Sequence, residues 1–215
     1  MAKVLLTGFE AFGGSVINPS EIAVSRLDGT TIAGSEVVGL TLPCAFGSAL
    51  DVLRHAIHRH RPKLVVCAGQ AGGRSEISIE RIAINVDDAR IPDNLGAQPI
   101  DQPIVRSGPP SYWSTLPIKS IVHELQLAGI KSGVSQTAGT FVCNHVFYGL
   151  MRTLAPKKGV RGGFVHVPYI RSQVQEHRTR PPTMPMTKIV RGLEVVIHTS
   201  LTTTRDLRAP GGSLH

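Results

Sequence analysis

The sequence predicts a single doubly wound α/β domain, in which helices cover both faces of a mostly parallel sheet. Apolar runs of strand length, such as 64–68, are typical of central parallel strands. Amphipathic helical segments alternate with these runs along the chain. Glycine-rich loops follow two of the strands, at 8–14 and 69–74, where α/β folds place ligands. A chain of 215 residues can bury one substantial core, so we expect one domain over 1–201.

Composition narrows the class of protein. Hydrophobic residues make up 41% and charged residues 18% of the chain, as in ordinary globular proteins. No apolar window is long enough to span a membrane, and the N-terminus lacks the pattern of a secretory signal, so we expect a cytoplasmic protein without a membrane partner. The three cysteines form no C-x-x-C pair, which favours reduced thiols over disulfides or a cysteine-based zinc site.

The net charge of +8 raises the question of nucleic acid. Phosphate binding needs positive charge gathered on one surface. Here the charge is scattered, and its densest stretches, 54–63 and 171–180, are not interleaved with aromatic residues. We therefore do not expect nucleic-acid binding to be the main function.

The first half of the chain alternates strands and helices. Asn18 before Pro19 is a good helix start, because asparagine caps the first turn and proline fits the first helical position. A later amphipathic helix ends in a basic turn, and we interpret its histidines as a solvated helix end, not a metal site, because no carboxylate or cysteine cluster accompanies them. The expected elements are strands at 4–7, 36–42 and 63–68 and helices at 19–27 and 46–61.

The two glycine-rich loops carry candidate ligand contacts. The first is neither a G-x-G-x-x-G nor a P-loop sequence, so dinucleotides and triphosphates are not indicated. It holds Phe9 and Phe12, which could line a ligand or plug the edge of the core. In the second loop, Gln70 is the side chain that can both donate and accept hydrogen bonds.

The segment 76–87 alternates like a strand. Residues 80, 82, 84 and 86 would then share one face, which places Glu80 in line with three aliphatic side chains. Because an unpaired buried charge is costly, Glu80 must have a partner or lie where the face opens into a cleft. The alternative is that Glu80 ends that face at the solvent.

The second half continues the alternation. Residues 88–116 are expected to form a long irregular segment, which in compact domains is often a lid or binding loop. The tail at 202–215, rich in threonine and then in glycine and proline, is expected to be disordered. The other expected elements are helices at 117–128 and 184–201 and strands at 133–135 and 162–167.

Cys143 lies between a Gly-Thr turn and an apolar helix. A helix N-terminus favours the thiolate, so Cys143 is a candidate nucleophile, although it could also be a small core residue. His166 ends the next strand, and in a parallel sheet successive strand ends meet at one edge. With Glu80, these residues supply the thiolate, base and orienting carboxylate of acyl transfer. His145 is a rival base, but neighbours i and i+2 on a helix do not face each other.

These stretches together resemble the pyroglutamyl peptidase I family of cysteine peptidases. The resemblance covers the chain to about Leu201, with one departure at Arg171, where members of the family often carry proline. The stretches that carry it are 6–13 with 18–20, 69–74, 80–85, 89–93, 139–144 and 166–169.

The resemblance implies an omega peptidase that removes an N-terminal pyroglutamyl residue through a triad of Glu80, Cys143 and His166. It also implies a homo-oligomer, commonly a tetramer, with no metal or organic cofactor. A pyroglutamyl group has a neutral lactam, which suits apolar walls and a few hydrogen bonds. The substrate-binding residues that it implies are Phe9, Phe12, Asn18, Gln70, Arg90 (close to the thiol), Ile91, Phe141 and Val142.

Two other functions remain open from the sequence. One is a relative of the purine nucleoside phosphorylases, which share this architecture, although no phosphate-binding arginine cluster is evident. The other is a catalytically silent basic binding module.

Overall fold

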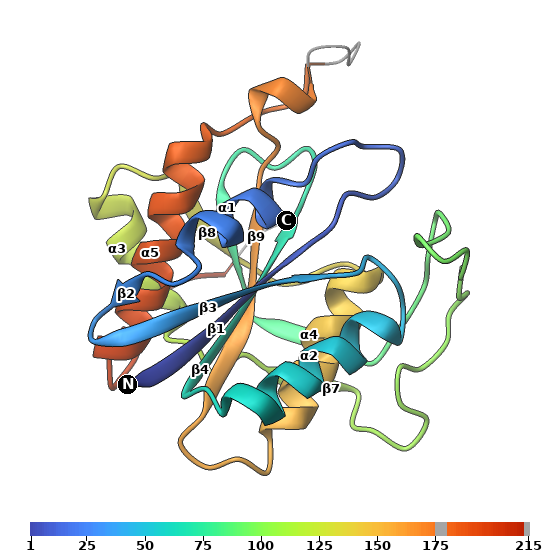
Figure 1. The fold of residues 1–215 in the computed structure, drawn as a ribbon, viewed down its shortest axis with the longest axis horizontal. Coiled ribbons are helices and arrows are strands. Elements are labelled where there is room, and N and C mark those ends of the chain that lie inside the picture. Colours follow the sequence, from blue (N-terminus) through green and yellow to red (C-terminus); the bar gives the residue numbers. More distant parts are fainter. Residues whose placement is uncertain (175–179, 213–215) are drawn as a thin grey trace.

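The computed structural model describes residues 1–174 and 180–212, and its centre is a seven-stranded sheet (Figure 1). The strand order is β2-β3-β1-β4-β9-β5-β8. The strands of this sheet are β1 (Ala2–Phe9), β2 (Thr31–Ile32), β3 (Ser35–Leu42), β4 (Leu64–Gln70), β5 (Ile77–Glu80), β8 (Ser132–Ser135) and β9 (Arg161–Val167).

The sheet is mostly parallel, as the sequence predicts. The neighbours β3, β1, β4 and β9 all run the same way, and they form the centre of the sheet. The short β2 runs against β3, and β5 runs against β9 while lying parallel to β8. The sheet therefore reverses direction between β9 and β5.

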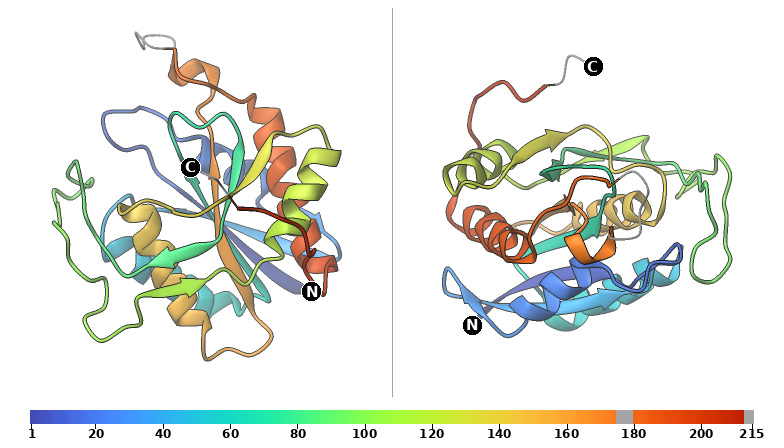
Figure 2. Two further views of the ribbon diagram at one scale, coloured as in Figure 1. Left: turned by 180° about the vertical axis from the view of Figure 1, so that it is seen from behind. Right: turned by 90° about the horizontal axis from the view of Figure 1, so that it is seen from above.

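Helices cover both faces of the sheet and form a three-layered domain (Figure 2). The helices are α1 (Pro19–Leu27), α2 (Ser48–His60), α3 (Ile118–Leu127), α4 (Val142–Leu154) and α5 (Met186–Thr202), with a 3₁₀ turn at Arg171–Gln173. On one face α1, α3 and α5 pack over one cluster of buried apolar side chains. On the other face α2 and α4 pack over a second cluster. Alternate residues of the central strands point into these two clusters, which is why the strands are apolar throughout.

The predicted helix starts and ends agree closely with the structure. Asn18 caps α1 by accepting a hydrogen bond from the Ser20 N–H at 3.0 Å, and Pro19 occupies the first helical position. Among the described residues, no helix combines the length and apolar character that a membrane span requires.

The expectation of one strand over 76–87 is wrong. The chain leaves the main sheet after Glu80, and beyond Arg81 it forms β6 (Ile82–Ile84), which pairs with β7 (Ser111–Trp113) in a separate two-stranded sheet. Ala83 is the buried residue of β6, whereas Ile82 and Ile84 are half-buried. The alternating pattern is compatible with two short strands because each keeps its own period of two.

The segment 203–212 contains no helix or strand, but it lies against the domain. Asp206 accepts hydrogen bonds from the first turn of α3, at 2.8 Å from the Ser120 N–H and 3.2 Å from the Lys119 N–H. The Gly211 carbonyl accepts from Arg81 at 2.7 Å. These contacts hold the tail, where the sequence led us to expect disorder, because Asp206 supplies the cap that Pro117 cannot give to α3. Residues 213–215 lie outside the described residues.

Candidate active site

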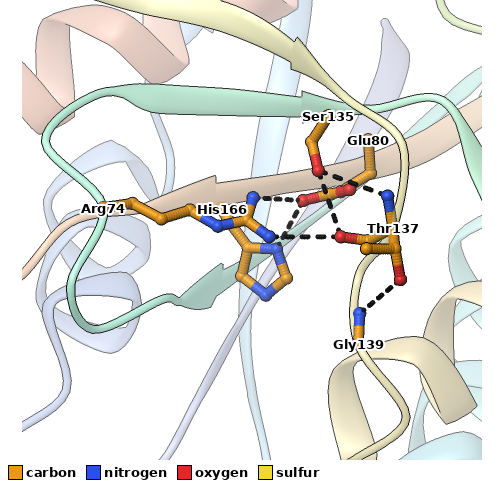
Figure 3. A network of polar contacts seen from close by, with 6 residues as sticks. All are labelled: Arg74, Glu80, Ser135, Thr137, Gly139 and His166. Carbon is orange, nitrogen blue, oxygen red and sulfur yellow. Dashed lines mark hydrogen bonds and ion pairs between the residues drawn. The ribbon is translucent and has the colours of Figure 1, made fainter. Parts of the chain in front are cut away.

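Glu80 and His166 form a buried hydrogen-bonded pair. On the antiparallel strands β5 and β9, Ser78 lies opposite His166, so Glu80 is the diagonal neighbour of the histidine on the same face. The Glu80 side chain is 0% exposed and that of His166 is 4% exposed. His166 Nδ1 lies 2.8 Å from Glu80 Oε1 (Figure 3). Glu80 therefore has a partner and does not end its strand at the solvent.

This pair fixes the protonation of the imidazole. An ionised carboxylate can only accept hydrogen bonds, so the proton of a neutral His166 ring lies on Nδ1 and points at Glu80. The other nitrogen, Nε2, then carries a free lone pair. His166 is thus prepared to take a proton from a group on its far side.

Cys143 is the second residue of α4 and is half-buried. Its Sγ lies beside Gly69 of β4, 2.9 Å from where a Cβ of that residue would be. Gly69 pairs with His166 across β4 and β9, and paired residues on parallel strands point to the same face. Thiol and imidazole therefore lie over the same face of the sheet at neighbouring positions. Gly69 leaves space for the sulfur because it has no side chain.

Burial, not the helix terminus, controls the resting thiol. Removal from water raises the pKa of Cys143 well above its usual value, the nearby Cys44 and Glu80 raise it further, and Arg74 lowers it. The expectation that the start of α4 favours the thiolate is therefore outweighed in the resting site. A base must accept the proton before the sulfur can attack, and His166 is the base at hand.

Arg74 is a site residue that the sequence analysis missed. Its Nη1 donates to Glu80 Oε1 at 2.7 Å, and its Nη2 donates to the Thr137 carbonyl at 3.1 Å (Figure 3). The signal was present, because Arg74 closes the second glycine-rich loop and a buried carboxylate requires a cation or several donors. Arg90, which the resemblance implies near the thiol, is exposed and is not among the charges that shift the pKa of Cys143.

Half-buried aromatic rings gather beside the thiol. The ring of Phe141, next to the start of α4, lies 6.0 Å from that of Phe12 and 5.4 Å from that of Phe46. Phe46 was not among the expected site residues. Phe9 is 1% exposed and packs 6.2 Å from Phe164, so it belongs to the core in this structure. The sequence left open whether these two rings line a ligand or close the edge of the core. Phe9 closes the edge of the core, and the position of Phe12 is compatible with the wall of a ligand pocket.

The other expected substrate contacts differ in how free their polar groups are. Asn18 is buried, accepts from Ser20 and donates to the Glu10 carbonyl, so its side chain stabilises the first loop. Gln70 is 9% exposed; its oxygen accepts from Gln173 at 2.7 Å, and no contact to its amide nitrogen is seen within residues 1–174 and 180–212. Val142 is fully buried, and Ile91 is 42% exposed.

His145 is fully occupied by other contacts. Its Nδ1 lies 2.8 Å from Asp87 Oδ2, and its Nε2 accepts from the Gly47 N–H at 3.1 Å. Its ring also meets that of Phe46 edge to face, with centroids 5.4 Å apart. These contacts tie α4 to the loop that carries Phe46, in agreement with a structural role.

Outside the surroundings of Cys143, the described chain shows few groupings of side chains that could bind a metal or act as a nucleophile. No group of three or more His, Cys, Asp or Glu side chains in the described residues could hold a metal ion. A cavity of about 670 Å³ lies between β2, α3 and α5, on the face of the sheet opposite α4. It is lined by Glu124, Arg191, Glu194 and His198 and contains no thiol. The chemistry is therefore concentrated around Cys143.

Known proteins resemble this chain over its whole length. The family model described as pyroglutamyl peptidase matches residues 2–203. The chain is 54% identical over 215 residues to the pyrrolidone-carboxylate peptidase of Klebsiella pneumoniae strain 342, and 52% identical over 217 residues to that of Cupriavidus taiwanensis; each match covers 100% of both chains.

Solved structures resemble it as well. The pyroglutamyl peptidase I of Bacillus amyloliquefaciens matches with a TM-score of 0.94 and 45% identity, over 98% of this chain and 100% of that one. A mutant pyrrolidone carboxyl peptidase from Pyrococcus furiosus matches with a TM-score of 0.90 and 43% identity, over 93% and 98% of the two chains.

Proposed function

The chain belongs to the pyroglutamyl peptidase family of cysteine peptidases, and from this premise we propose that it removes N-terminal pyroglutamyl residues from peptides. The observation that carries the proposal is the buried Glu80–His166 pair beside the thiol of Cys143. Family membership also sets aside the nucleoside phosphorylase and the silent binding module as leading functions.

In the proposed reaction, His166 Nε2 takes the thiol proton as Cys143 Sγ attacks the carbonyl carbon of the pyroglutamyl residue. The imidazolium is stabilised by the carboxylate of Glu80, which accepts from Nδ1 at 2.8 Å. The same proton then passes to the leaving amine as the C–N bond breaks, and a thioester remains on Cys143. Water, deprotonated by His166, hydrolyses the thioester and restores the thiol.

The start of α4 provides donors for the charge that develops on the substrate oxygen. The helix has no side-chain cap at Phe141, so the N–H groups of its first turn are not satisfied by a capping side chain. Backbone N–H groups at a helix N-terminus stabilise an oxyanion strongly when water is excluded. Cys143 is the second residue of that turn, so its own backbone N–H is one of these donors.

The surroundings of the thiol suit a neutral ring better than a charged amine. The rings of Phe12, Phe46 and Phe141 offer apolar walls, and the Gln70 amide offers hydrogen bonds. An ordinary N-terminal ammonium would lose its hydration in such a pocket without gaining a counter-ion. The pocket therefore favours the neutral lactam over a charged amine, because no counter-ion offsets the lost hydration of the amine.

The test is incubation with a pyroglutamyl arylamide under reducing conditions. We expect release of the arylamine by the wild type, and loss of most of it in Cys143→Ser and His166→Ala variants that remain folded. Proline and alanine arylamides serve as matched controls for the lactam oxygen and the ring. No release by the wild type, or full turnover by Cys143→Ser, would contradict the proposal.

We further propose a homo-oligomer, commonly a tetramer in this family, that acts in the cytoplasm. The three free cysteines, Cys44, Cys67 and Cys143, are compatible with a reducing compartment. Sedimentation velocity at several protein concentrations checks the assembly, and a single species with the mass of one chain would contradict it.

A further inference from the structure

Arg74 connects three separate parts of the site. It comes from the loop after β4, its Nη1 contacts Glu80 at the end of β5, and its Nη2 contacts the Thr137 carbonyl in the loop that leads to α4. The Thr137 carbonyl also accepts from Ser135 Oγ at 3.0 Å, and Thr137 Oγ1 accepts from the Gly139 N–H at 3.0 Å (Figure 3). One guanidinium group therefore links the carboxylate to the chain segment that carries the nucleophile.

The charge balance around Glu80 depends on this contact. The carboxylate is 0% exposed, and both of its partners, Arg74 and His166, bind the same oxygen, Oε1. The other oxygen, Oε2, is buried without a partner among the described residues. A buried carboxylate held only by a neutral imidazole would be strongly disfavoured in its charged form. The cation of Arg74 offsets that cost.

We propose that Arg74 is a positioning residue of this peptidase, which keeps Glu80 ionised for His166 and fixes the loop before Cys143 relative to both. The inference rests on the proposed function, because it assigns Arg74 a part in the same site. Arg74 acts through Glu80 and Thr137 and does not itself contact the reacting atoms.

The sign of its electrostatic effect follows from the groups that face the thiol. They are Cys44 from the loop after β3, Cys67 from β4, Glu80 from β5, His166 from β9, and Arg74. Arg74 is the permanent cation in this set. Without it, the pKa of Cys143 rises further, so the thiol ionises at higher pH.

The experiment compares Arg74→Gln, Arg74→Lys and the control Arg54→Gln, which removes an arginine paired with Asp51 on α2. For Arg74→Gln we expect kcat to fall on the order of 10²-fold with KM changed less than about threefold. The acid limb of the kcat/KM profile should move up by about one pH unit. Arg74→Lys keeps the charge and should keep the acid limb of the wild-type kcat/KM profile. It should still lose some kcat, although less than Arg74→Gln, because one ammonium cannot span both acceptors.

Two further measurements separate this role from a general effect on folding. In a Glu80→Gln background, Arg74→Gln should lower kcat by a smaller factor than in the wild-type background, because the ion pair with Glu80 is already gone and the contact to Thr137 is what remains to be lost. The rate of Cys143 alkylation by iodoacetamide, followed by mass spectrometry, should show the same upward shift in pH without any substrate. If the protein does not cleave pyroglutamyl peptides, the alkylation rate of Cys143 still tests the role of Arg74, because that measurement needs no substrate. Wild-type kcat and an unshifted alkylation profile in folded Arg74→Gln, or a shifted profile in Arg74→Lys, would overturn the inference.

Discussion

Replacing Gly69 by alanine is expected to disable the nucleophile while the fold remains. A Cβ at this position would lie 2.9 Å from Cys143 Sγ and 2.9 Å from Cζ of Phe164, whereas ordinary contacts of this kind measure 3.4–4 Å. To reach an ordinary contact, the sulfur would have to move by about 0.5 Å, the difference between 3.4 and 2.9 Å. Phe164 is 0% exposed and packs against Phe147 and Phe9, with ring centroids 5.9 and 6.2 Å away, so the half-buried thiol is the easier group to displace.

The magnitude follows from the geometry. Displacing a reacting atom by up to about 1 Å costs on the order of 10²-fold in rate. The extra methyl group also overpacks a buried strand, at about 1 to 3 kcal/mol of stability. We expect the loss in kcat to exceed what the stability change explains, because the variant should remain mostly folded at 25 °C.

The assay measures kcat, KM and the urea midpoint for Gly69→Ala and for a matched control, Gly163→Ala. A Cβ at Gly163 would meet Ser114 and Leu116 on the opposite face of the sheet, so the control overpacks a neighbouring strand without touching the thiol. Equal kcat in Gly69→Ala and the wild type, or equal losses of kcat in the two variants, would refute the placement of the sulfur.

Three further outcomes are expected. Burial raises the pKa of Cys44 and of Cys67 to about 12 from 9.0, so both stabilise the fold below pH 9 and lose that contribution as the pH rises to about 12. Urea unfolding at pH 8 and pH 10 should show a loss of about 1.4 kcal/mol per pH unit for each thiol above pH 9; a flat profile contradicts their burial. Asn18→Ala should cost about 1 kcal/mol of unfolding free energy through the lost cap of α1; Asn18→Asp keeps the cap acceptor but loses the donor to the Glu10 carbonyl, so it should not restore the wild-type stability. Asp206→Ala should cost a similar amount by uncapping α3, and an unchanged thermal midpoint would show that the tail is not held there.

Much of the fold could be predicted because local signals agree with tertiary packing. Capping by Asn18 and the apolar period of each helix placed α1, α2, α3 and α5 to within a few residues. The direction of β5 could not be predicted, since a short alternating segment looks the same in either direction. Its direction is decided by pairing with β8 and β9, which lie far along the chain.

The site was predictable where chemistry follows strand ends. His166 and Gly69 meet because β4 and β9 are parallel neighbours. The expectation that the strand before Cys143 runs parallel to the strand of His166 is wrong, because β8 runs opposite to β9 and β5 lies between them. Glu80 reaches the histidine from a strand that runs the opposite way, which the sequence did not reveal. Phe9 continues the buried face of β1 and thus joins the core. Arg74 was missed because its partners, Glu80 and Thr137, come together only in three dimensions.

The reversed direction of β5 also affects the order in which the chain folds. Glu80 and His166 are separated by 86 positions, and both strands that pair with β5 in the described part of the chain, β8 and β9, follow it in the sequence. During synthesis, Glu80 emerges long before β8 and β9 and must remain hydrated until they arrive. Contacts of such long range form late relative to helices, because closing the intervening loop is entropically costly. In refolding, helical circular dichroism should therefore return before peptidase activity, which reports the final closure of the sheet.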